Sequence, residues 1–143
     1  MNSTYFSIIV PTFNRPDEVD ELMASLTNQS YREFELILAD GTPDESLVKI
    51  IDKYRTELSV QHLHRPYLGI SDSRNLGCQH AKGQYFIFLD SDCVLPKNYL
   101  DNVLKGLNDN QFDAFGGPDA ADESFTPLQK AISYSMTSML TTG

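Results

Sequence analysis

Short apolar runs alternate with segments of helical periodicity along this chain, and this alternation constrains its fold more than any other feature. The apolar runs cover residues 6–10, 34–39, 59–63, 84–89 and 112–115. The first helical segment between them places apolar side chains at i, i+3, i+4 and i+7, namely Val19, Leu22, Met23 and Leu26. Strands that alternate with helices predict parallel β-α-β units. We therefore expect an α/β fold, Rossmann-like, with a mostly parallel sheet and helices on both faces.

Local signals predict where several elements begin and end. Pro11 is expected to end the first strand, and residues 42–45 have the pattern of a capping box that opens the second helix. Gly83 fits the C′ position of the third helix, and Pro96 fits the first position of the fourth. A last amphipathic helix is expected over residues 127–140.

Composition narrows the class of protein. The chain has 143 residues, which suits about one domain, and its 20 acidic against 11 basic residues give a net charge of −9. This surface disfavours a nucleic-acid partner and an anionic membrane. Cys78 and Cys93 form no C-x-x-C pair, so a zinc site or a disulfide framework is not expected. Without a signal peptide or membrane span, we expect a cytoplasmic protein, at most peripheral to the inner face of the membrane.

Unusual polar residues follow three of the predicted strands. The segment 12–14 follows the first strand, Asp40 follows the second, and the segment 90–92 follows the fourth. In an open parallel sheet, ligands bind beyond the carboxyl ends of the strands. The sequence therefore predicts a ligand site at this edge, where Phe13 could pack against a nucleotide base.

Asp90 and Asp92 form a D-x-D pair at the end of a strongly apolar run. Two close carboxylates favour a cation near them, and hard oxygen ligands select Mg²⁺ or Mn²⁺, often together with substrate phosphates. The alternative is a solvated turn in which one of the two caps the following helix. Asp40 can accept hydrogen bonds from a ribose or a base, or form an Asx-turn with Gly41, and both can hold at once.

The turn after the first strand lacks the glycine-rich motifs of dinucleotide folds and P-loops. A bound diphosphate would therefore need a metal and cationic side chains, for which Arg15 and Arg74 are candidates; the alternative is that they are surface arginines. His62 and His64 alternate on a strand-like segment, where a surface or interface role is more in keeping with the absence of further metal ligands.

Four segments in order carry a family resemblance: Ile8-Ile9-Val10-Pro11-Thr12-Phe13-Asn14-Arg15, Ala39-Asp40-Gly41-Thr42, Gly69-Ile70-Ser71-Asp72-Ser73-Arg74-Asn75-Leu76-Gly77 and Phe88-Leu89-Asp90-Ser91-Asp92. Over residues 5–118 the chain resembles the nucleotide-sugar half of the family 2 glycosyltransferases. The resemblance implies a GT-A fold and transfer of a sugar from a nucleotide donor, usually with inversion. It implies a metal, Mg²⁺ or Mn²⁺, on Asp92 and Asp90. It also implies a nucleotide site made of Pro11, Thr12, Phe13, Asn14, Asp40, Arg74, Asn75, Asp90 and Ser91, with Asp40 on the base.

The sequence departs from the family pattern at a few positions. Ala39 stands where the family often has an aspartate, and Ser73 stands where it usually has alanine. After Asp92 we find no credible general base, since the acidic residues at 119–123 lie in a loop with flanking Gly and Pro. We therefore expect residues 1–118 to be the donor-binding core and residues 119–143 to begin an acceptor-side region. The C-terminal helix, cut short, could then self-associate.

The resemblance and the residues leave the partners partly open. A UDP-sugar donor and a carbohydrate or lipid-linked acceptor in polysaccharide biosynthesis are expected by family analogy. A nucleotidyltransferase would need a Gly-rich loop with basic residues after the first strand, which is absent. The residues also fit a non-catalytic Mg²⁺-binding α/β module, or a chain that binds the donor without transferring it.

Overall fold

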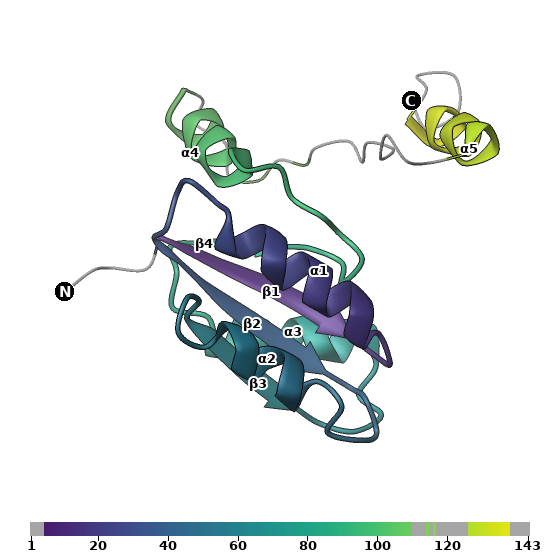
Figure 1. Cartoon of the computed structure of the whole chain (residues 1–143). Coiled ribbons are helices and arrows are strands. Elements are labelled where there is room, and N and C mark those ends of the chain that lie inside the picture. Colours follow the sequence, from purple (N-terminus) through teal and green to yellow (C-terminus); the bar gives the residue numbers. More distant parts are fainter. Residues whose placement is uncertain (1–4, 110–113, 115, 117–125, 138–143) are drawn as a thin grey trace. The chain divides into compact units, whose positions relative to one another are not determined.

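The computed structural model describes residues 5–109, 114, 116 and 126–137 (Figure 1). The chain divides into two compact units, Met1–Asn108 and Asp109–Gly143, which we treat separately. The elements of the chain are β1 (Phe6–Thr12), α1 (Pro16–Thr27), β2 (Phe34–Asp40), α2 (Val48–Tyr54), β3 (Val60–His64), α3 (Ile70–His80), β4 (Tyr85–Phe88), α4 (Tyr99–Asp109) and α5 (Pro127–Thr137). The functional boundary expected near residue 118 stays a prediction, because residues 117–125 lie outside the described part.

The described strands form one parallel sheet in the order β3-β2-β1-β4. β1 pairs with β2 from Phe6↔Phe34 to Thr12↔Asp40, and it pairs with β4 up to Ile9↔Phe88. Because all four strands run the same way, their carboxyl ends lie at one edge. The predicted α/β, Rossmann-like fold is confirmed.

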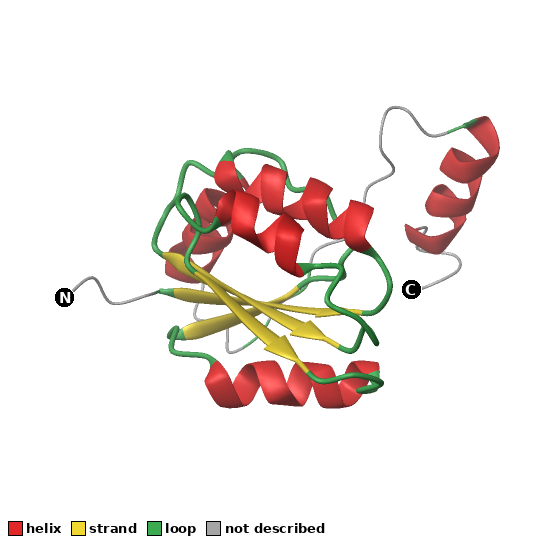
Figure 2. Cartoon of the chain, turned by 60° about the horizontal axis from the view of Figure 1, so that its bottom comes forward, coloured by secondary structure: helices red, strands yellow, loops and turns green. Residues whose placement is uncertain are grey.

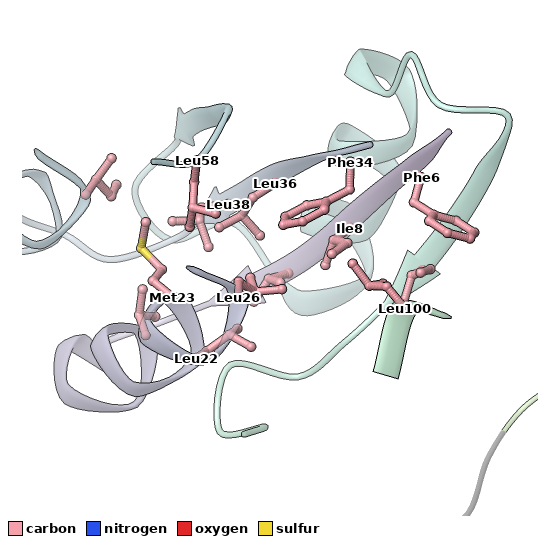
Figure 3. Close-up of a cluster of buried hydrophobic side chains, with 14 of the residues drawn as sticks. Phe6, Ile8, Leu22, Met23, Leu26, Phe34, Leu36, Leu38, Leu58 and Leu100 are labelled. Atoms are coloured by element: carbon pink, nitrogen blue, oxygen red, sulfur yellow. The ribbon is translucent and has the colours of Figure 1, made fainter. Parts of the chain in front are cut away.

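Helices cover both faces of this sheet (Figure 2). Every residue of β1 and β2 is buried, as expected for central parallel strands. On one face, alternate β1 and β2 side chains pack with the apolar side of α1 and with Leu100 of α4 (Figure 3). On the other face, α3 approaches so closely that a Cβ at Gly77 would lie 2.4 Å from Cγ2 of Ile9. This glycine therefore sets the spacing between α3 and the sheet.

A buried carboxylate fastens the amino-terminal edge of the sheet. Glu35 is 3% exposed, and its Oε1 accepts hydrogen bonds from Ser7 Oγ and from the Lys82 N–H, each at 2.7 Å. Its Oε2 accepts a bond from Gln61 Nε2, also at 2.7 Å. Gly83 N–H donates in turn to Ser7 Oγ at 2.8 Å. The network ties β1, β2, β3 and the loop before β4 together, on the edge opposite the predicted site.

Two predicted strand and helix ends in the first half of the chain are wrong. Pro11 does not end β1, which continues to Thr12. β4 stops pairing with β1 at Ile9, so Pro11 lies beyond the β4 ladder, where a missing N–H costs little. The capping box at 42–45 does not form: α2 begins at Val48, and no side chain caps it. The Thr42 side chain accepts a hydrogen bond from Asn14 N–H instead.

The later helix ends also differ from the prediction. α3 ends at His80, and no glycine in the described part has a positive φ, so Gly83 is not a left-handed cap. Its lack of a side chain serves packing, since a Cβ there would lie 2.6 Å from Ser7 N. α4 begins at Tyr99, three residues after Pro96, and α5 ends at Thr137. Residues 138–140 of the predicted last helix lie outside the described residues, as do 112, 113 and 115 of the predicted fifth strand.

Candidate functional site

A pocket of about 250 Å³ opens at the carboxyl edge of the sheet. Side chains from segments 11–15, 68–73 and 90–92 line it. Its volume is below the roughly 300–1,000 Å³ of typical small-molecule pockets, so a ligand of nucleotide size would extend beyond it. Of the three segments predicted to meet at this edge, those after β1 and β4 line the pocket together, whereas Asp40, after β2, does not line it.

The two carboxylates after β4 are each paired with an arginine. Arg74 Nη2 lies 2.8 Å from Asp90 Oδ1, and Arg15 Nη1 lies 3.4 Å from Asp92 Oδ2. All four side chains are exposed to solvent by a third or more. Exposed pairs of this kind contribute at most about 1 kcal/mol. A cation can therefore replace the arginines at these carboxylates at little cost, and the released arginines can meet anionic groups.

The donor set at this edge fits a metal that arrives with a phosphate ligand. Among the described residues, no three His, Cys, Asp or Glu side chains gather to form a metal centre by themselves. Asp90 and Asp92 offer hard oxygen ligands in the same pocket. Mg²⁺ commonly binds through one or two carboxylates together with substrate phosphates. This pair therefore suits a cation whose remaining ligands come from a diphosphate.

Thr12 supplies an unused polar group to the pocket. Its Oγ1 is the one buried side-chain oxygen or nitrogen in the described part of the chain without a hydrogen-bond partner. Leaving such a group unpaired costs about 1–3 kcal/mol. Because Thr12 also lines the pocket, a bound ligand could supply the missing partner.

Asp40 ends β2 and is held from two sides. Its side chain is 0% exposed; Oδ1 accepts the Thr42 N–H at 2.8 Å, and Oδ2 lies 2.9 Å from His62 Nε2. Burial alone would raise the pKa of Asp40, but hydrogen bonds from His62 and Thr42 outweigh it and keep the pKa below the usual value. Asp40 is thus an anion, and the Asx-turn considered from the sequence is present.

The turn after β2 connects the loops on both sides of it. Gly41 N–H donates to Thr12 O at 3.0 Å, and Asn14 N–H donates to Thr42 Oγ1 at 3.0 Å. On the other side, Tyr67 N–H donates to Gly41 O at 2.7 Å. Asn14 and Tyr67 both have left-handed backbones, with φ of 53° and 63°. Such strain persists only where surrounding bonds enforce it, so this turn fixes the shape of both loops.

The sequence matches a family of known proteins over most of its length. A family model described as glycosyl transferase family 2 matches residues 7–141. The chain belongs to the family 2 glycosyltransferases.

Curated relatives of this glycosyltransferase are identical to it at about a third of the aligned positions. It is 31% identical over 112 residues to poly(ribitol-phosphate) beta-N-acetylglucosaminyltransferase TarS of Staphylococcus aureus, covering 76% of this chain and 20% of that protein. It is 32% identical over 111 residues to the uncharacterized glycosyltransferase EpsJ of Bacillus subtilis, covering 77% and 32%. The chain thus spans well under half the length of these relatives.

Solved structures support the GT-A fold. Residues 1–349 of S. aureus TarS in complex with UDP match with a TM-score of 0.70 and 28% identity, over 80% of this chain and 38% of that one. The mannosyltransferase PcManGT from Pyrobaculum calidifontis, in complex with GDP-Man and Mn²⁺, matches with a TM-score of 0.66 and 21% identity, over 71% and 32%. At that identity, the second match supports the fold alone.

The glycosyltransferase pocket contains many of the residues expected from the sequence. Those that line it are Pro11, Thr12, Phe13, Asp90, Ser91 and Asp92, together with Arg15. Arg74 does not line the pocket but forms an ion pair with Asp90, which does. Asn14 contributes its backbone N–H, which donates to Thr42 Oγ1. Asp40 lies in the turn beside these loops, and Asn75 is exposed on α3 without lining the pocket.

The sequence predicts a surface or interface role for His62 and His64, but the structure places both against the turn after β2. Both bond to the turn after β2, His62 to Asp40 and His64 to the Thr42 carbonyl. The available signal was their spacing of two residues on the strand that neighbours β2.

No described helix is both long and apolar enough to span a membrane.

Proposed function

We propose that this chain forms the donor-binding portion of an inverting, metal-dependent glycosyltransferase. It would hold a UDP-sugar whose sugar passes to a hydroxyl of a carbohydrate or lipid-linked acceptor in polysaccharide biosynthesis. The observation that carries this proposal is the pocket that Asp90 and Asp92 line together with the loop after β1. Each carboxylate forms a solvent-exposed ion pair with an arginine.

The residues divide into two groups by the part of the donor they would hold. Asp92, with Asp90, would hold Mg²⁺ or Mn²⁺, which as a Lewis acid would stabilise the negative charge of the leaving diphosphate. Arg15 and Arg74, released from these carboxylates, would neutralise the remaining phosphate charge. Phe13, 47% exposed, would pack against the base.

The turn after β2 would form the nucleoside side of the pocket. Asp40 is buried with both oxygens engaged, so its first role is to hold this turn in shape. The turn would have to open before Asp40 could accept a hydrogen bond directly from the base. Support for uridine comes from relatives, since TarS is solved with UDP and with UDP-GlcNAc.

The general base is assigned to no described residue. Of the described side chains that line the pocket, only Asp90 and Asp92 are acidic, and we place both at the diphosphate. A base must lie within hydrogen-bond reach of the acceptor hydroxyl, so we expect another part of the protein to supply it.

Self-association through the helix 127–140 stays a prediction; Leu128 and Tyr134 are exposed on α5 within its own unit.

Calorimetric titration of UDP, GDP and CDP, each with Mn²⁺ and with a chelator, tests the proposal. We expect UDP to bind, and to bind only with metal. Asp92→Asn should abolish this metal-dependent binding of UDP. Asp52→Asn is the matched control, because Asp52 is also an exposed carboxylate bonded to an arginine, Arg55 Nε at 2.6 Å, but on α2.

The outcomes of this titration separate a nucleotide-binding donor site from a metal-binding module. Mn²⁺ binding that no nucleotide enhances would favour a non-catalytic metal-binding module. Equal UDP affinity in Asp92→Asn and the wild type would remove Asp92 from the metal site. Inversion is tested in the full-length enzyme by the anomeric configuration of the product.

A further inference from the structure

His62 and His64 lie side by side on β3, next to the turn that follows β2. The register pairs Leu38 with His62 and Asp40 with His64. Their rings are stacked, with centroids 5.7 Å apart and planes at 17°. The two imidazoles therefore form one surface against residues 40–42.

Each imidazole bonds a different end of that turn. His62 Nε2 lies 2.9 Å from Asp40 Oδ2, and His64 Nε2 lies 2.7 Å from the Thr42 carbonyl oxygen. A carbonyl and an ionised carboxylate only accept hydrogen bonds, so both Nε2 atoms carry a proton and donate. The turn is held by two donors from a single strand.

From this geometry we propose that His62, supported by His64, is a positioning residue for nucleoside binding. The proposal rests on the proposed function, in which the turn after β2 forms the nucleoside side of the pocket. His62 is 11% exposed, and it is the side-chain partner of Oδ2 on a carboxylate that is 0% exposed. Without it, Asp40 would be a buried anion that lacks the imidazole donor at its Oδ2 atom.

Loss of the His62 hydrogen bond would also weaken the hydrogen bonds that connect Asp40 to the loop containing Phe13. Asp40 Oδ1 holds the Thr42 N–H, and Thr42 Oγ1 holds the Asn14 N–H. If the carboxylate turns away, both bonds lose their anchor, and Asn14 is released from its left-handed backbone.

The diphosphate side of the pocket is held by other bonds. Asp90 pairs with Arg74 of α3, and Asp92 pairs with Arg15, which follows Asn14 but whose carbonyl oxygen is held to α1 by the Val19 N–H at 3.1 Å. Loss of His62 should therefore weaken recognition of the nucleoside and spare that of the diphosphate.

The test measures binding of UDP and of pyrophosphate, each with Mn²⁺, to the 143-residue chain and its variants. We expect His62→Leu to weaken UDP about tenfold, the scale of one hydrogen bond to a charged group, and to leave pyrophosphate unchanged. His62→Gln should recover most of the affinity, because its amide can donate to Asp40. His80→Leu is the control, since His80 bonds a backbone carbonyl within α3, at Leu76.

Hydrogen exchange at the Thr42 and Asn14 amides gives a second readout that needs no ligand. Both should exchange faster in His62→Leu than in the wild type and in His62→Gln. Equal loss of UDP and pyrophosphate, failure of His62→Gln to recover UDP, or unchanged exchange at both amides would overturn the positioning role. If the wild type binds neither ligand, the proposed function and the nucleoside role fail together, and exchange at the two amides shows only whether His62 holds the turn.

Discussion

Replacing Gly41 with alanine should force the two loops beside the pocket apart. The new Cβ would lie 2.6 Å from the Leu68 backbone oxygen and 3.3 Å from Phe13 Cδ2. The Phe13 ring can yield, but a backbone oxygen moves only with its loop. Overpacking costs about 1–3 kcal/mol. Weakening the Tyr67 N–H bond to Gly41 O adds about 1 kcal/mol. We expect a total loss of about 2–4 kcal/mol.

Thermal unfolding and UDP titration measure this effect. For a chain of this size, the loss corresponds to a fall of about 10 °C in Tm. Affinity for UDP should also fall, because Leu68 and Phe13 both line the pocket. Gly69→Ala is the control in the same loop, where the nearest described atom to a new Cβ is Asp72 Oδ2 at 3.9 Å. Equal Tm values for Gly41→Ala, Gly69→Ala and the wild type would refute the steric reasoning.

Three further predictions concern the scaffold. Glu35→Ala should lower the free energy of unfolding by about 3 kcal/mol, because three donors lose their acceptor, and Glu35→Gln should recover part of it; urea denaturation measures both. Hydrogen bonds from Lys53 and then Tyr54 lower the pKa of Asp20. The stability that Asp20 adds is therefore present above its unfolded pKa and is lost as the pH falls through its folded pKa. Tyr54→Phe should then destabilise the protein at about pH 7 more than at about pH 2, and an equal effect at both would contradict this. Gly77→Ala should cost about 1–3 kcal/mol in the same assay, because its Cβ would lie 2.4 Å from a β1 side chain, and a neutral result would show that α3 can shift.

The fold was predictable because its central strands carry an unambiguous signal. The runs at 6–10 and 34–39 are largely apolar, as befits strands buried on both faces. Their ends were not predictable from single residues. Pro11 is tolerated in β1 because β4 stops pairing at Ile9. The Thr42 side chain does not cap a helix and accepts the Asn14 N–H instead. Both reasons depend on segments distant in the chain.

The site was predictable to the extent that strand order determines it. Polar residues after parallel strands must meet at one edge, which places Asp90 and Asp92 beside the loop after β1. The role of His62 could not be found in this way. It depends on the register of β3 against β2, and a shift of one residue would move both histidines to the opposite face. The arginines on Asp90 and Asp92 likewise depend on side-chain positions that the sequence does not specify.

The middle position of β1 in the sheet has a kinetic consequence. Ser7 bonds Glu35 across 28 residues of chain but bonds Gly83 across 76. Closing the longer loop costs more entropy, so we expect β1 and β2 to pair first and β4 to join later. Segment 90–92 arrives with β4, which makes the pocket one of the last features to form. A nucleotide that binds there stabilises contacts absent from the folding transition state, so it should slow unfolding without accelerating refolding.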